Sequence, residues 1–178
     1  MIRLFAAVEL PPEIAEGLIR RQHGLPGAAW RPETALHITL RFFGEVQNTT
    51  AADLDEALAQ VAMPSFDLHL EGAGAFGDNE HMRAVWAGVA MSEPLRRLAR
   101  KCEAAAREVG LKGEARTYRP HVTLAYIRAA TAERTGEWVA ENNLIRSPVW
   151  RVRHFNLYSS WLSEDGARYD LERTYQLS

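Results

Sequence analysis

Two short segments of the chain each place a histidine two residues before a threonine. They are His-Ile-Thr-Leu at 37–40 and His-Val-Thr-Leu at 121–124, almost half the chain apart. Side chains two apart on a β-strand point to the same face of a sheet. If both segments are strands, each presents an imidazole beside a hydroxyl on a rigid element, which is what positioned proton transfer needs.

Two imidazoles that face each other could act as an acid–base pair. With an unperturbed pKa of about 6.5, one can be neutral and the other protonated near neutral pH. The neutral ring would take a proton from an attacking water while the protonated ring gives one to the departing oxygen. Phosphodiester cleavage needs both transfers, and threonine hydroxyls could donate to the non-bridging oxygens. The pattern alone leaves a second interpretation open, an old duplication whose chemistry has been lost.

The elements around the two motifs follow from apolar spacing and from turn residues. Strands are expected at 3–9, 36–43, 66–70, 81–89, 119–127, 149–158 and 168–175, and helices at 12–23, 53–62, 93–109 and 132–141. Ser92 is the expected N-cap of the third helix and Gly110 its stop. Glycines predict a loosened segment at 72–77, and turn residues predict a loop at 26–32 and a turn at 164–166.

The order of these elements indicates the fold class. It lacks a regular βαβ rhythm, which favours an α+β fold over a doubly wound sheet. The repeated motif predicts one domain, residues 1–178, made of two similar antiparallel lobes about a pseudo-twofold axis. No linker separates the lobes, so we expect them to share one hydrophobic interface. In the first motif the face expected in the core consists of Leu36, Ile38, Leu40 and Phe42. The opposite face is expected to carry His37, Thr39, Arg41 and Phe43.

Composition excludes several classes of protein. The 178 residues are 47% hydrophobic with a net charge of −2, which is typical of a soluble globular protein and unlike a basic protein that coats nucleic acid. The single cysteine, Cys102, falls on the predicted helix 93–109 and is expected to be buried. The histidine spacings match no metal motif, so we expect no metal and no cofactor. No apolar stretch is long enough to span a membrane, which predicts a cytoplasmic protein.

Together with their flanks, the two motifs resemble the paired signatures of the 2H phosphoesterases. The wider context is similar to the bacterial and archaeal RNA 2′,3′-cyclic phosphodiesterases, historically called 2′-5′ RNA ligases. The supporting segments cover almost the whole chain and are 3–11, Trp30, 36–45, 83–86, 119–121, 157–160 and 166–169. The resemblance implies two lobes whose histidines face each other across a central cleft.

This resemblance also implies a reaction and a role for each motif residue. The reaction is metal-independent hydrolysis of a terminal 2′,3′-cyclic phosphate to a 2′-phosphomonoester; run backwards, it joins RNA ends through a 2′-5′ bond. His37 would be the proton donor to the leaving 3′ oxygen, and His121 the proton acceptor that activates water. Thr39 and Thr123 would bind the phosphate. Because the motifs are nearly symmetric, the residues themselves leave open which histidine is the acid.

One residue departs from the family pattern. Many members carry an arginine where this chain has Tyr126. The absence of that arginine removes a cation that would hold the phosphate. Arg128 or Arg41 could substitute for it; alternatively Tyr126 stacks on the terminal base or fills the cleft wall. Phe42 matches an aromatic residue of the family's cleft, whereas alternation places it on the core face. These four residues are candidates for substrate binding.

Three functions are compatible with these residues. The leading hypothesis is a monomeric enzyme that acts on RNA 3′ ends bearing a 2′,3′-cyclic phosphate, such as tRNA halves or short oligonucleotides. The second is an RNA- or nucleotide-binding module whose cleft no longer turns over, with Tyr126 as the lesion. The third is a 2H enzyme for a small cyclic nucleotide, which would gain nothing from a longer substrate.

Overall fold

The computed structural model describes residues 1–164 and 166–178. Its helices are α1 (Pro12–Ile19), the 3₁₀ helix η1 (Glu33–Ala35), α2 (Asn48–Ala59), α3 (Glu93–Glu108) and α4 (Ala132–Asn142). Its strands are β1 (Ile2–Glu9), β2 (Ala28–Trp30), β3 (His37–Val46), β4 (Phe66–Leu68), β5 (Leu70–Gly77), β6 (Met82–Val89), β7 (His121–Ile127), β8 (Trp150–Val152), β9 (His154–Ser163) and β10 (Gly166–Gln176).

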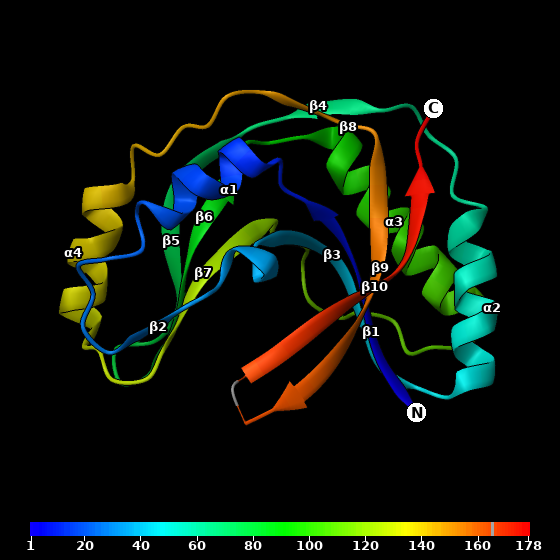
Figure 1. Cartoon of the computed structure of the whole chain (residues 1–178), viewed down its shortest axis with the longest axis horizontal. Coiled ribbons are helices and arrows are strands. Elements are labelled where there is room, and N and C mark those ends of the chain that lie inside the picture. The colour runs from blue at the N-terminus through cyan, green and yellow to red at the C-terminus, as the bar shows by residue number, and fades with distance from the viewer. Residues whose placement is uncertain (165) are drawn as a thin grey trace.

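Two four-stranded antiparallel sheets form the body of the molecule (Figure 1), in the orders β10-β9-β1-β3 and β2-β7-β6-β5. The first motif begins β3 and the second begins β7, and these two strands contact each other. The strand β3 is the edge of its sheet and pairs with β1, whereas β7 is an inner strand that pairs with β6 and β2. The predicted α+β fold with two similar lobes is confirmed.

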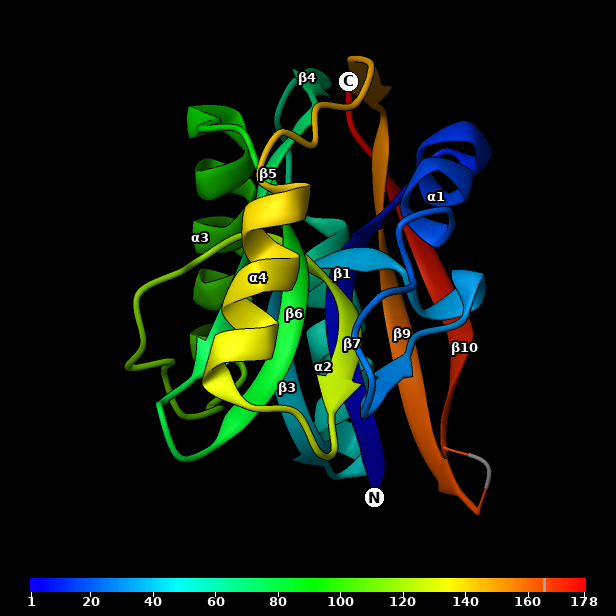
Figure 2. The ribbon, with the colours of Figure 1, turned by 90° about the vertical axis from the view of Figure 1, so that its left-hand side faces the viewer.

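The helices cover the apolar side of each sheet. In one lobe α3 packs on β3 and against α2, and in the other α4 packs on β5 and β6 (Figure 2). The hydroxyl of Ser92 accepts a hydrogen bond from the backbone N–H of Leu95 at 3.2 Å, which caps α3. Gly110 follows the end of this helix with a φ of +83°. Both predicted boundaries of α3 are confirmed.

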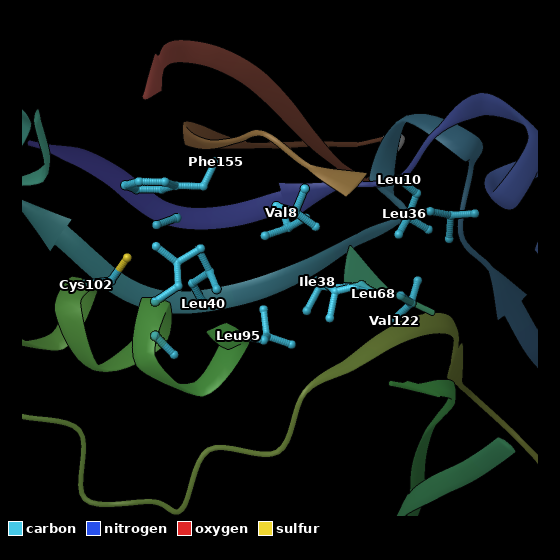
Figure 3. Packing of buried hydrophobic residues seen from close by; sticks show 14 of the residues in the cluster. Val8, Leu10, Leu36, Ile38, Leu40, Leu68, Leu95, Cys102, Val122 and Phe155 are labelled. Atoms are coloured by element: carbon cyan, nitrogen blue, oxygen red, sulfur yellow. The ribbon is translucent and has the colours of Figure 1, made fainter. Parts of the chain in front are cut away.

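One cluster of buried side chains draws on both sheets. Figure 3 shows Ile38 and Leu40 of β3 facing Leu95 and Cys102 of α3, and Val122 of β7 belongs to the same cluster. Burial also raises the pKa of the Cys102 thiol to about 12, as expected for a packing residue. Because the core side of both motif strands is fixed in this way, their histidines are held on the other side.

Some elements differ from the sequence prediction. The glycine-rich segment forms the regular strand β5 and pairs with β6. Gly74 leaves room for the ring of its partner Trp86, since a Cβ there would lie 2.3 Å from the ring atoms. Strand β2 forms inside the predicted loop by pairing with the edge of β7. Helix α2 begins at Asn48, earlier than the expected Asp53. The predicted turn at 164–166 includes Asp165, which lies outside the described residues.

Candidate active site

Each motif strand contains a β-bulge one residue after its threonine. In β3 the register with β1 shifts between residues 39 and 41, so Leu40 has no partner. In β7 the register with β6 shifts between residues 123 and 125, so Leu124 has no partner on β6. A bulge adds one residue to a strand, and the alternation of faces reverses beyond it. The two lobes therefore share a local irregularity as well as a motif.

The bulges bring an aromatic side chain onto the histidine face of each strand. Phe42 is 41% exposed and Tyr126 is 50% exposed, whereas Phe43 is buried. The expectation that Phe42 packs into the core and Phe43 lies beside His37 is wrong, because alternation was counted without the bulge. Phe42 and Tyr126 occupy equivalent positions, and each has a guanidinium over its ring, from Arg3 at 5.0 Å and from Arg31 at 5.1 Å.

His37 lies in an aromatic setting at the start of β3. Its imidazole stacks on Phe5 with ring centres 4.9 Å apart, and Tyr169 contacts it edge-on at 5.5 Å. Burial lowers the pKa of His37 from 6.5 to about 4, and the positive charges of Arg31 and His121 act in the same direction. In the free protein at neutral pH, His37 is therefore uncharged.

His121 is held by a hydrogen bond as well as by aromatic contacts. Its Nδ1 lies 2.6 Å from the backbone carbonyl oxygen of Arg119. A carbonyl only accepts, so Nδ1 carries the proton and Nε2 is left with a free lone pair whenever the ring is neutral. Phe76 packs edge-on at 4.8 Å, and burial lowers the pKa of His121 below its usual value.

The two threonines lie on the histidine faces and are half-buried. Within the residues that the structure describes, neither hydroxyl forms a hydrogen bond to the protein, so both are available to a ligand. The backbone carbonyl of Thr39 accepts a hydrogen bond from the Tyr118 hydroxyl at 2.9 Å. Because Tyr118 lies just before β7, this bond links the start of the second motif to the first.

Arg31 is the cation that the sequence analysis missed. Its guanidinium lies between Tyr126 of one sheet and Tyr169 of the other, donating to the Tyr169 hydroxyl at 3.0 Å. Its backbone N–H donates to the carbonyl of Leu124 at 2.8 Å, which extends the β2–β7 pairing. The only signal in the sequence was its place after Trp30. Arg31, Tyr126 and His37 thus lie together around Tyr169, and His121 is near enough for its charge to act on the pKa of His37.

The two predicted substrate-binding arginines differ in their surroundings. Arg41 is buried, paired with Glu103 of α3, and donates to the backbone carbonyl of Lys112 at 2.7 Å. The bulge turned it toward the helices, so the expectation that it shares the face of His37 is wrong. Arg128 is exposed one residue beyond the end of β7, where its backbone N–H donates to the carbonyl of Gly27 at 2.8 Å, and its contact with substrate stays a prediction.

The part of the chain that the structure describes contains neither a cluster of metal ligands nor a membrane-spanning helix. Among residues 1–164 and 166–178, no three His, Cys, Asp or Glu side chains come close enough together to hold a metal ion. No helix in the same part of the chain has the length and apolar character needed to cross a membrane.

Known proteins match this chain over most of its length. The family model of the 2′-5′ RNA ligase superfamily matches residues 10–161. A curated protein of Archaeoglobus fulgidus named RNA 2′,3′-cyclic phosphodiesterase is 30% identical over 98% of this chain and 100% of its own length. One of Escherichia coli with the same name is 33% identical over 94% of this chain and 92% of its own. A third, of Aeropyrum pernix, is 41% identical, but the match spans about half of either protein, 53% and 54%.

Solved structures share the fold. Apo LigT of Escherichia coli superposes with a TM-score of 0.82 and 27% identity, covering 99% of this chain and 98% of that one. The same protein in complex with 3′-AMP has a TM-score of 0.80 and 29% identity over the same shares of the two chains. With two bulged His-x-Thr strands at the centre of this fold, the chain belongs to the 2′-5′ RNA ligase superfamily.

Proposed function

We propose that this chain hydrolyses 2′,3′-cyclic phosphate ends of RNA to 2′-phosphomonoesters by general acid–base catalysis. The observation that supports this most directly is the placement of His37 and His121 on equivalent bulged strands, around one arginine and two free threonine hydroxyls. The substrate class is supported by relatives named RNA 2′,3′-cyclic phosphodiesterase that match nearly the whole chain.

In this mechanism His121 is the base. Because its Nδ1 donates to the carbonyl of Arg119, the lone pair of Nε2 is free to accept a proton from water. The lowered pKa keeps the ring neutral at physiological pH, which is the state that a base needs. As the water oxygen bonds to phosphorus, its proton moves to Nε2 of His121.

His37 is the acid, although its pKa of about 4 leaves it neutral in the free protein. A phosphodiester brings a negative charge into the cleft, and an anion beside an imidazole favours the protonated form. Substrate binding therefore raises the pKa of His37 and loads it with a proton. That proton passes to the 3′ oxygen as the P–O3′ bond breaks, which leaves a 3′ hydroxyl and a 2′-phosphate.

The remaining site residues hold the phosphate. The hydroxyls of Thr39 and Thr123 donate to its non-bridging oxygens, and Arg31 supplies the positive charge from the cleft wall. Tyr126 and Tyr169 fix the guanidinium in place from both sides. Together these groups stabilise the charge that grows on the phosphoryl oxygens in the transition state.

We further propose the biological setting. The chain acts as one unit, residues 1–178, in the cytoplasm and as a monomer, on short oligonucleotides or tRNA halves. If a 5′ hydroxyl attacks in place of water, it gives its proton to His121 while His37 protonates the 3′ oxygen, and the two RNA ends are joined through a 2′-5′ bond.

The test is a short RNA with a 2′,3′-cyclic phosphate, incubated with the protein in EDTA and analysed for the 2′-phosphate product. His37→Ala and His121→Ala run beside it, with the exposed His81→Ala as the matched control. We expect product from the wild type and from His81→Ala, and a loss of roughly 10²–10⁴-fold in each motif variant. Saturable binding without product would instead identify a binding module. Equal turnover of cyclic mononucleotides and RNA would identify an enzyme for small nucleotides.

A further inference from the structure

A pocket opens beside His121. It has a volume of about 460 Å³ and lies where β5 and β6 meet the first turn of α3 and the segment before β7. His121 forms part of its wall, so the pocket leads directly away from the atoms that would react. Among the residues that line it are Phe76, Trp86, Gly88, Ser92, Arg96 and Arg119.

One side of this pocket is flat and aromatic. The ring of Trp86 lies against Gly74, where any Cβ would come within 2.3 Å of it, and Phe76 contacts Trp86 with ring centres 5.5 Å apart. A Cβ at Gly88 would lie 2.4 Å from the carbonyl oxygen of Glu71, so this part of the wall also has no side chain. Flat aromatic surfaces beside open space suit a nucleobase, because every base has a face that stacks.

Two arginines supply positive charge at the same pocket. Arg119 is exposed with its guanidinium 5.5 Å from the centre of the Phe76 ring, and Arg96 is half-buried in the first turn of α3. In the part of the chain that the structure describes, no carboxylate lies within 4 Å of either guanidinium. The carboxylate of Glu71 instead faces Arg146 at 3.7 Å. The pocket therefore combines a stacking surface with two unneutralised cations.

We propose that this pocket binds the nucleotide immediately 5′ to the reacting end of the RNA. Its base lies against Trp86, and the phosphodiester that joins it to the terminal nucleoside lies between Arg96 and Arg119. A volume of about 460 Å³ holds one such unit rather than a longer stretch of chain. The subsite rests on the proposed function and deepens it, because it makes the protein an enzyme for oligonucleotide ends rather than for cyclic mononucleotides.

The experiment compares two substrates that share the same cyclic end. We would measure kcat/KM for a 2′,3′-cyclic mononucleotide and for a dinucleotide ending in that nucleotide, with wild type, Arg96→Ala, Arg119→Ala and the double variant. Arg100→Ala is the matched control, since Arg100 is exposed on α3 and paired with Glu93 at 2.5 Å. We expect the wild type to prefer the dinucleotide at least tenfold, and each pocket variant to lower that preference by up to about tenfold, mainly through KM. Arg100→Ala should leave the preference unchanged.

Salt dependence gives an independent readout of the same interaction. Each arginine that no longer binds the phosphodiester should flatten the slope of log kcat/KM against log salt by about 0.7 for the dinucleotide. Equal kcat/KM for both substrates in the wild type, or a decrease in Arg96→Ala that is the same for both, would overturn the subsite and leave the hydrolase intact. Absence of turnover on either substrate would overturn the proposed function and the subsite with it.

Discussion

The two motif strands share a backbone irregularity but hold their histidines in different ways. His37 packs against both Phe5 and Tyr169, next to the cation Arg31. His121 also contacts aromatic rings, yet its Nδ1 is fixed by the carbonyl of Arg119. Two nearly identical strands thus give one imidazole whose charge depends on its surroundings and one whose reactive nitrogen is defined by a hydrogen bond.

The difference shows how a nearly symmetric scaffold could support an asymmetric reaction. The base must present a lone pair in the free enzyme, and the Nδ1 hydrogen bond of His121 ensures this. The acid must be protonated when substrate is bound, and the low pKa of His37 leaves its charge under the control of the bound anion. The repeated motif supplies geometry, whereas neighbours that are not repeated assign the roles.

The largest expected effect comes from removing one histidine at a time. Each alanine variant should lose roughly 10²–10⁴-fold in kcat/KM, and the residual activities should depend on pH in opposite directions. Without the base His121, activity should fall as pH rises, because only the loss of the proton on His37 is left to titrate. Without the acid His37, activity should rise with pH until His121 is fully neutral.

The measurement is a pH series of kcat/KM between about pH 4 and 8 for both variants, with His81→Ala as the control. The same two trends with the residues exchanged would show that His37 is the base and His121 the acid. Equal losses and parallel pH trends in both variants would remove the functional distinction between the lobes altogether.

The pH optimum of the wild type follows from the same shifts. The pH profile of kcat/KM reports the pKa values of the free enzyme. Both of its pKa values should therefore lie below 6.5, one near the His37 pKa of about 4 and the other at the lowered His121 pKa. Above the higher of these two pKa values, kcat/KM should fall about tenfold per pH unit, because the fraction of enzyme with a protonated His37 decreases. The optimum of kcat should lie at higher pH, since the bound phosphate raises the pKa of both rings. An optimum of kcat/KM near pH 8 would contradict this account.

Removing Arg31 should affect both the phosphate and His37. Arg31→Ala should lower kcat/KM by roughly ten- to a hundredfold, because a charge-assisted hydrogen bond to the phosphate is removed. It should also raise the pKa of His37, since the guanidinium holds that pKa down. An NMR titration of the His37 ring in the free protein checks the second effect. Arg134→Ala is the matched control, since Arg134 is exposed on α4 and paired with Glu137 at 2.6 Å, and equal losses in the two variants would exclude a specific role for Arg31.

Arg41 and Ala125 occupy equivalent positions in the two bulges, yet only Arg41 is charged. Its pairing with Glu103 ties β3 to α3, whereas Ala125 is buried without such a link. Arg41→Ala should therefore lower the free energy of unfolding by about 2 kcal/mol, or Tm by roughly 4–8 °C, with little change in kcat/KM. Thermal denaturation and an assay well below Tm check this. A loss of kcat/KM without a loss of stability would instead show that Arg41 takes part in substrate binding.

The sequence predicted the elements whose signals are local or repeated. The cap and stop of α3 lie within a few residues of the helix that they bound, and both are where expected. The two His-x-Thr segments identified the centre of the fold because the same face pattern occurs twice. Ile38 and Val122 confirm the core side of both strands, since both are fully buried.

The features that the sequence could not predict depend on pairing between distant segments. The residue type of Leu40 is compatible with either a regular strand or a bulge. The bulge forms because of the register in which β3 pairs with β1. With that choice Arg41 turns toward Glu103 and Phe42 turns outward. Arg31 reaches Tyr126 and Tyr169 only because β2 pairs with the edge of β7, which is far along the chain.

The smallest expected effect separates the two exposed aromatic residues that follow the bulges. The guanidinium of Arg31, the proposed phosphate ligand, lies over the ring of Tyr126, whereas the guanidinium of Arg3 lies over the ring of Phe42. An exposed cation–π contact contributes about 0.5–1 kcal/mol, so Tyr126→Leu should lower kcat/KM roughly two- to fivefold, while Tyr126→Phe keeps the ring and the activity. Phe42→Leu should leave kcat/KM unchanged. If Phe42→Leu instead loses as much as Tyr126→Leu, both rings contact RNA, and the two lobes are more alike in binding than they are in proton transfer.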